Sequence, residues 1–329
     1  MLTINLPVSE LLRGRGVKSL ILITGSRGLI GRSLVERLAA KGIACREFDI
    51  ARSAGEDTRD QAALSIALEG VTGVVHLAAI SRVVWAERDP GLTQSVNVDA
   101  LQFLLGAMAL GGQRPWLLFA SSREVYGEPA SLPVAEDAPL APLNVYARSK
   151  VNGELLVERA REAGILANIV RFSNVYGCID DHSDRVVPAF ARTAAHGGAL
   201  RLDGPDNMFD FTHVDDVVRG LEAHIEATAA REFLPPVHFL TGVGTTLNAL
   251  ADMAARASTH DLDVEIALPR NYDVARFVGD ASRAHSLLGW QARIDLATGF
   301  AALTEAYRSA AGLPPAAASR GLSQAAVGV

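Results

Sequence analysis

Residues 19–42 carry the pattern that most restricts the fold of this chain: an apolar run, a glycine turn and an amphipathic helix. The run Ser19-Leu-Ile-Leu-Ile-Thr24 has the length and continuity of a strand buried on both faces of a parallel sheet. It stops at Gly25, and apolar residues then recur at helical spacing from Leu29 onward. The spacing Gly25-x-x-Gly28-x-x-Gly31 permits a tight turn and lets helix N-terminal amides approach a diphosphate. The pattern predicts a dinucleotide-binding βα unit.

The second predicted strand, residues 44–50, indicates which dinucleotide is bound. Asp49 lies at its end, where a carboxylate accepts both ribose hydroxyls of adenosine and repels a 2′-phosphate. This favours NAD over NADP. Arg52 follows closely, and a guanidinium there would instead accept the phosphate. A third apolar run, residues 71–79, ends in small residues that leave room for a planar ring.

Tyr146 and Lys150 are spaced for proton transfer. At positions i and i+4 of a helix they share one face, and a nearby cation favours the phenolate and lowers the tyrosine pKa from its usual value near ~10. Ser122 ends another strand-like run and is placed to hydrogen-bond the same substrate oxygen. Such a pair on a solvated helix face is also common, so the motif gains its meaning from the glycine turn.

In order, these motifs resemble the extended short-chain dehydrogenase/reductase family, and within it the NAD-dependent nucleotide-sugar epimerases and dehydratases. The resemblance spans about residues 18–310 and rests on seven segments: Gly25-x-x-Gly28-x-x-Gly31, His76-Leu-Ala-Ala79, Ser121-Ser-Arg-Glu-Val-Tyr-Gly127, Tyr146-x-x-x-Lys150, Arg171-Phe-Ser-Asn-Val-Tyr-Gly177, Phe211-Thr-His-Val-Asp-Asp216 and Leu287-Leu-Gly-Trp290. It implies that Tyr146 removes the proton of a sugar 4-hydroxyl while hydride passes to NAD, giving a transient 4-keto sugar and NADH. Lys150 would hold the nicotinamide ribose, and Ser122 would polarise the new carbonyl.

The resemblance also implies a set of cofactor-binding residues along the sheet edge. They are Gly25, Gly28, Leu29, Ile30, Gly31, Asp49, Asp57, Thr58, Leu77, Ala78, Ala79, Asn97, Tyr146, Lys150 and Phe172.

Arg123 and Glu124, which follow Ser122, bear on the reaction. Similar dehydratases carry Thr-Asp-Glu here, with the aspartic acid protonating the departing 6-hydroxyl and the glutamate removing the C5 proton. Arginine cannot donate that proton, since its pKa exceeds ~12. UDP-glucuronate decarboxylases carry a Ser-Glu pair, from which Arg123 also departs. Arg123 either points into the pocket and pairs with a uronate carboxylate, or strand alternation turns it toward solvent or a salt bridge.

Residues that would bind a nucleotide-diphosphate sugar follow from the resemblance. Asn174 takes the place of an asparagine that contacts the substrate, and Arg270 that of a diphosphate-binding arginine; Val187 and Arg201 complete the prediction. A second family arginine is replaced here by Phe209, and Arg201 or Arg192 would have to compensate.

His213, Asp215 and Asp216 have catalytic side chains but a structural context. They lie where a strand passes into a helix over residues 217–225, which indicates that Asp215 or Asp216 caps the helix and that His213 is packed.

The complete pattern predicts an α/β fold: a Rossmann-type doubly wound parallel sheet with a smaller, discontinuous C-terminal substrate lobe. We expect an N-terminal arm over 1–17, an NAD-binding domain over 18–175 completed by segments near 205–240, a substrate lobe over 176–311, and a disordered tail over 312–329. Relatives dimerise through two helices, here about residues 99–110 and 146–163, so a homodimer is expected.

Composition narrows the functional classes. With 329 residues, 49% hydrophobic residues and a net charge of −6, the chain suits a soluble cytoplasmic enzyme rather than a nucleic-acid binder. Cys45 and Cys178 have no metal-ligand spacing and are expected to be reduced, with no metal site. No apolar run reaches the ~18–20 residues of a membrane span, and residues 1–17 lack the core of a secretory signal.

These observations rank three functions. A 4-epimerase comes first, because it needs only Ser122, Tyr146 and Lys150. A dehydratase or UDP-glucuronate decarboxylase-like enzyme using Glu124 comes second. A non-catalytic NAD-binding regulatory protein, suggested by Phe209 in place of an arginine, is the alternative from another class.

Overall fold

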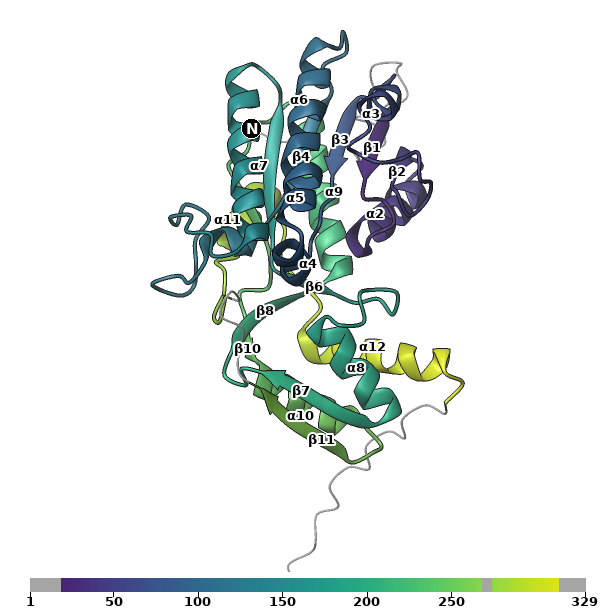
Figure 1. Cartoon of the computed structure of the whole chain (residues 1–329), viewed down its shortest axis with the longest axis vertical. Coiled ribbons are helices and arrows are strands. Elements are labelled where there is room, and N and C mark those ends of the chain that lie inside the picture. Colours follow the sequence, from purple (N-terminus) through teal and green to yellow (C-terminus); the bar gives the residue numbers. More distant parts are fainter. Residues whose placement is uncertain (1–18, 268–273, 314–329) are drawn as a thin grey trace, which may run out of the picture.

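The computed structural model describes residues 19–267 and 274–313 and contains a six-stranded parallel sheet (Figure 1). Its strand order is β2-β1-β3-β4-β5-β9. The bounds are β1 (Leu20–Thr24), β2 (Ala44–Phe48), β3 (Gly73–His76), β4 (Trp116–Ser122), β5 (Ala167–Phe172) and β9 (Val237–Phe239). The order reverses between β1 and β3, and a crevice therefore opens there at the carboxyl ends of the strands.

Helices cover both faces of this sheet, as alternation along β1 requires. Ile21 and Ile23 pack toward one core, formed with α2 (Leu29–Ala40), α9 (Val214–Ala229) and α11 (Ser282–Leu288), whereas Leu22 packs toward the other. That second core includes α3 (Gln61–Ala67), α6 (Ala100–Leu110) and α7 (Val145–Glu162). The predicted doubly wound Rossmann-type fold is confirmed.

A smaller lobe lies below the sheet in Figure 1 and has its own apolar core. Its strands form a sheet of order β10-β8-β6 and the pair β11-β7. The elements are β6 (Asn174–Tyr176), α8 (Val186–His196), β7 (Gly198–Asp203), β8 (Met208–His213), β10 (Gly244–Thr246), α10 (Leu247–Ala257), β11 (Leu262–Ala267) and α12 (Leu296–Ala310). The lobe is discontinuous because α9, β9 and α11, which lie between its segments, belong to the main domain.

Short helices shape the loops that reach the crevice. They are α4 (Val83–Arg88), α5 (Pro90–Gln94), the π-helix η1 (Ser95–Asp99) and the 3₁₀ helix η2 (Arg123–Tyr126).

Some predicted boundaries change in the structure. The strand predicted over 44–50 ends at Phe48, and the helix predicted over 217–225 is α9, residues 214–229. Of the segments near 205–240, β9 extends the main sheet whereas β8 joins the small one. The predicted arm over 1–17 and nearly all of the predicted tail lie outside the described residues. No helix within the described ranges is long and apolar enough to cross a membrane.

Candidate active site

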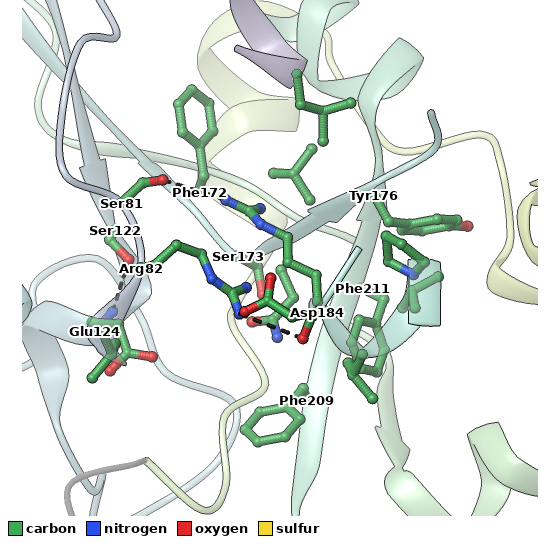
Figure 2. Close-up of a pocket in the computed structure, with 18 of the residues that line it drawn as sticks. Ser81, Arg82, Ser122, Glu124, Phe172, Ser173, Tyr176, Asp184, Phe209 and Phe211 are labelled. Atoms are coloured by element: carbon green, nitrogen blue, oxygen red, sulfur yellow. Dashed lines mark hydrogen bonds and ion pairs between the residues drawn. The ribbon is translucent and has the colours of Figure 1, made fainter. Parts of the chain in front are cut away.

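A cavity of about 580 Å³ lies between the carboxyl edge of the main sheet and the smaller lobe (Figure 2). It is lined by the glycine turn, by the ends of β3 and β4, by Tyr146 and Lys150 of α7, and by residues of α8 and β8. The cavity thus joins the predicted cofactor and substrate regions in one space.

The glycine turn is built so that backbone, not side chain, faces this cavity. Gly25 has φ of +71°, and a Cβ there would lie 2.7 Å from the backbone nitrogen of Ala78. A Cβ on Gly31 would lie 2.1 Å from the carbonyl oxygen of Gly25. At Gly28 a Cβ would meet only that same oxygen, at 3.4 Å, and Gly28 lines the cavity. The turn can therefore admit a diphosphate against the first amides of α2, which fits NAD.

Asp49, directly after β2, is held against the glycine turn. Its carboxylate accepts hydrogen bonds from the backbone N–H of Arg27 and of Ala51, each at 2.8 Å. Arg52, the possible phosphate ligand, donates both Nε and Nη2 to Glu56 instead. This arrangement supports the preference for NAD over NADP.

The other predicted cofactor residues differ in whether they line the cavity. Leu29, Ile30, Leu77, Ala79 and Phe172 line the cavity. Asp57 and Thr58 follow β2, and a hydrogen bond from Arg59 lowers the pKa of the Asp57 carboxyl. Ala78 packs against Gly25, as described above. Contact of these residues with NAD stays a prediction.

Asn97 is buried in η1 and binds protein rather than lining the cavity. Its Oδ1 accepts from the backbone N–H of Ile80 at 2.7 Å, and its Nδ2 donates to the Ile80 carbonyl at 3.1 Å and to Ser149 Oγ at 2.9 Å. Asn97 therefore fixes the loop after β3 relative to α7.

Tyr146, Lys150 and Ser122 come together at the cavity. Asn144 caps α7 by accepting from the N–H of Ala147, which starts the helix just before Tyr146. Lys150 Nζ donates to the carbonyl of Ala120 at 2.8 Å and lies 5.8 Å from the centroid of the Tyr146 ring. Ser122, at the end of β4, accepts a hydrogen bond from the backbone N–H of Glu124 at 3.2 Å, and its hydroxyl acts to lower the pKa of Tyr146.

The expected lowering of the tyrosine pKa is wrong for the protein alone. Burial raises the pKa of Tyr146 to about 12, and the Ser122 hydroxyl offsets only part of that effect. Burial also lowers the pKa of the Lys150 ammonium to about 8. Spacing along the sequence reveals the nearby cation but not the desolvation of the two buried groups.

Arg123 is buried rather than directed to solvent. Its Nε donates to Asn174 Oδ1 at 2.9 Å, and its Nη2 lies 2.8 Å from Glu124 Oε1. Its guanidinium carbon lies 4.9 Å from the ring centroid of Phe209. Strand alternation does not apply, because β4 ends at Ser122 and η2 begins at Arg123.

Every predicted substrate residue that the structure describes lines the same cavity. Asn174, Val187, Arg192 and Arg201 all do so, and Arg270 lies outside the described residues. The Arg201 side chain is 70% exposed and pairs with Asp203. Phe209 occupies the cavity wall where the family resemblance places an arginine.

Two further arginines were missed by the sequence argument. Arg82, before α4, pairs with Asp184 at 2.7 Å, and Arg185, before α8, donates to Ser81 at 3.4 Å. Figure 2 shows the Arg82–Asp184 pair within the cavity. The partners are about a hundred residues apart, and spacing could not reveal them. The only available signal was that Arg82 follows shortly after a strand's carboxyl end.

His213 and Asp216 have structural contacts. His213 Nδ1 accepts from the N–H of Asp215 at 3.2 Å and so caps α9, which corrects the prediction that an aspartate is the cap. Asp216 instead accepts from the backbone N–H groups of Arg293 and Ile294, each at 2.8 Å. Across residues 19–267 and 274–313, no cluster of His, Cys, Asp and Glu is arranged to hold a metal ion.

The Rossmann-type sheet, the glycine turn and the Ser-Tyr-Lys set define an NAD-dependent enzyme. Residues 21–233 match the model of the NAD dependent epimerase/dehydratase family, to which the chain belongs.

Individual relatives cover almost the whole chain. The UDP-glucose 4-epimerase of Mycolicibacterium smegmatis is 32% identical in an alignment 311 positions long that covers 88% of this chain and 98% of that protein. The dTDP-glucose 4,6-dehydratase of Streptomyces griseus is 29% identical, over 87% of this chain and 93% of that one. The solved structure of MoeE5 in complex with UDP-glucose and NAD superposes with a TM-score of 0.81 at 27% identity, covering 88% of this chain and 99% of that chain.

Proposed function

We propose that this protein is a nucleotide-sugar 4-epimerase that works through a transient 4-keto sugar. One observation carries the proposal. Ser122, Tyr146 and Lys150 converge on the cavity, whereas Ser122 is followed by Arg123 and by Glu124, which is paired with Arg123. Epimerisation at C4 needs only the first three groups. The epimerase named among the relatives supports the same reaction.

Each of the three residues has a definite task. Bound NAD supplies a hydride acceptor that later returns the hydride. Tyr146 takes the proton of the 4-hydroxyl as hydride leaves C4. The 4-keto sugar then turns in the cavity, so that hydride returned to its other face, with the proton given back by Tyr146, inverts C4. Ser122 hydrogen-bonds the same oxygen, and the Lys150 ammonium favours the phenolate. The positive charge of a bound nicotinamide adds to that of Lys150 and opposes the effect of burial.

Dehydration and decarboxylation are the second candidates, because a dehydratase occurs among the relatives. Both would rely on Glu124. Its Oε1 lies 2.8 Å from Arg123 Nη2, and its Oε2 accepts from Asn144 Nδ2 at 3.0 Å. The acid that dehydratases use is replaced by Arg123, which cannot donate a proton at neutral pH. These contacts favour epimerisation over either alternative. Family membership favours an enzyme over a non-catalytic regulator.

The substrate we propose is a nucleotide-diphosphate sugar lying across the cavity. Arg192 and Arg201 line its lobe side and are suited to a diphosphate, while Asn174 faces the sugar region. We further propose a homodimer formed through α6 and α7. Exposed Leu110 and Leu155 on these helices support that surface. The unpaired Cys45 and Cys178 and the net charge of −6 support a cytoplasmic location.

A product panel tests the reaction directly. We would incubate the enzyme and NAD with UDP-, GDP-, CDP- and dTDP-sugars and identify the products by NMR. A C4 epimer is expected. A 4-keto-6-deoxy sugar or a pentose would instead show dehydration or decarboxylation and reject the proposal.

Tyr146→Phe tests the catalytic assignment. Removing the hydroxyl should lower kcat by about 10²–10⁴-fold, the usual contribution of proton transfer. Arg256→Gln, on an exposed face of α10, serves as a matched control that should keep its rate. Turnover that survives Tyr146→Phe unchanged would remove Tyr146 from the mechanism.

A further inference from the structure

Arg123 contacts the carboxylate of Glu124, and both residues directly follow Ser122 in the sequence. The Arg123 side chain is 9% exposed and the Glu124 side chain 10%. Figure 2 shows Glu124 beside Ser122 at the edge of the cavity. Glu124 therefore lines the cavity next to Ser122, yet its carboxylate oxygens contact Arg123 and Asn144.

Aromatic rings and an amide hold the Arg123 guanidinium in this position. Its central carbon lies 4.9 Å from the Phe209 ring centroid and 5.7 Å from that of Phe277, distances typical of cation–π contacts. Nε is fixed by Asn174. The family resemblance places an arginine at position 209, and an arginine there would put a second cation against the Arg123 guanidinium. Phe209 and Arg123 are thus complementary departures from the family pattern.

We propose that Arg123 is the positioning residue that decides the fate of the 4-keto sugar, by engaging Glu124 so that it does not remove the C5 proton. The inference rests on the proposed 4-epimerase function. A 4-keto sugar has an acidic hydrogen on C5. If a carboxylate takes that proton, the C5–H electron pair forms the C4–C5 double bond of an enolate, and returning a proton to C5 restores the ketone. To do this, Glu124 must give up a buried, charge-assisted contact with Arg123.

Solvent exchange at C5 reports this step without requiring a new product. Turnover of UDP-glucose and dTDP-glucose by the NAD-loaded enzyme in D₂O would be followed by NMR. The unaltered enzyme should epimerise C4 with C5 remaining protiated. Deuterium at C5 in the unaltered enzyme during C4 turnover overturns the inference while leaving the epimerase function intact.

Variants at Arg123 separate its charge from its packing. Arg123→Gln should raise C5 exchange per C4 turnover by at least about 10-fold, because a freed carboxylate is a competent general base. Arg123→Lys keeps a cation and should keep C5 protected. The double variant Arg123→Gln/Glu124→Gln should return exchange to the level of the unaltered enzyme, and Arg256→Gln should leave it unchanged. A purely structural role would lower C4 turnover without moving this ratio.

The outcomes distinguish the two proposals. If Arg123→Gln epimerises C4 without C5 exchange, Arg123 does not restrain Glu124 and the inference fails alone. If the unaltered enzyme epimerises no sugar of the panel, the proposed function fails and the inference with it. Should Arg123→Gln not fold, as judged by circular dichroism, the unaltered enzyme and Arg123→Lys still decide the question, because C5 exchange in either contradicts the proposal.

Discussion

At the scale of single residues, burial dominates the chemistry of the site. Tyr146 and Lys150 are both buried, and desolvation disfavours the phenolate of one and the ammonium of the other. Sequence spacing identified the pair, because i and i+4 positions share a helix face. Spacing contains no information on solvent access, and the direction of the tyrosine shift was therefore wrong.

The lowered pKa of Lys150 predicts an alkaline limit to activity. As pH rises through about 8, the ammonium loses its proton and no longer supports the phenolate, so kcat/KM should fall. Lys150→Arg, whose guanidinium stays charged beyond about pH 12, should remove this limb even if its absolute rate is lower. The measurement is a kcat/KM profile for both proteins. A rate for the unaltered enzyme that still rises near pH ~10 would contradict the prediction.

At the scale of elements, the β1–turn–α2 unit was predicted correctly because its signals are local. Apolar continuity, glycine positions and helical periodicity all lie within residues 19–42. The segment after Ser122 was harder to predict. Whether a strand continues to alternate or turns into a 3₁₀ helix depends on what packs above it, here Phe209 and Asn174 from the smaller lobe. The orientation of Arg123 was therefore left open.

Two glycines of the β1–turn–α2 unit, Gly31 and Gly28, should differ in how much stability the protein loses when each is replaced by alanine. In Gly31→Ala the new methyl would lie 2.1 Å from the Gly25 carbonyl oxygen, so the turn must shift. We expect a loss of about 1–3 kcal/mol in the free energy of unfolding.

Gly28→Ala is the matched comparison. Its φ of −70° suits alanine and its Cβ makes an ordinary contact, so stability should change by less than about 0.5 kcal/mol. NAD affinity should fall, because Gly28 lines the cavity and a methyl there would narrow the space for a diphosphate. Denaturant unfolding and NAD titration measure the two effects. Equal losses of stability would show that the turn is not as tightly packed at Gly31 as described.

At the scale of the whole molecule, contacts between distant segments complete what local patterns begin. The fold class and the Ser-Tyr-Lys set were predictable because ordered motifs fix the topology. Pairs such as Arg82–Asp184 were not, since they depend on how the lobe lies against the sheet. Asp216 is another long-range contact: it ties α9 to residues 293–294, on the path from α11 to α12.

Asp216→Ala should destabilise the molecule as a unit. The substitution leaves the N–H groups of Arg293 and Ile294 without their acceptor and removes the carboxylate that pairs with Arg219. We expect a loss of about 2–5 kcal/mol in the free energy of unfolding, measured by urea denaturation. Asp216→Asn, which keeps one acceptor oxygen, should lose less. A loss below about 0.5 kcal/mol for the alanine variant would show that water replaces the carboxylate.

The discontinuity of the smaller lobe limits how this enzyme can be recombined with its relatives. Because α9, β9 and α11 return to the main sheet between lobe segments, no single cut in the chain separates a complete NAD domain from a complete lobe. A fragment ending near residue 175 would lack α9 and α11 and would leave bare the apolar part of the sheet face that these two helices cover. Chimaeras that import another substrate lobe will therefore need several junctions, and new specificities are more readily sought by replacing side chains within the cavity.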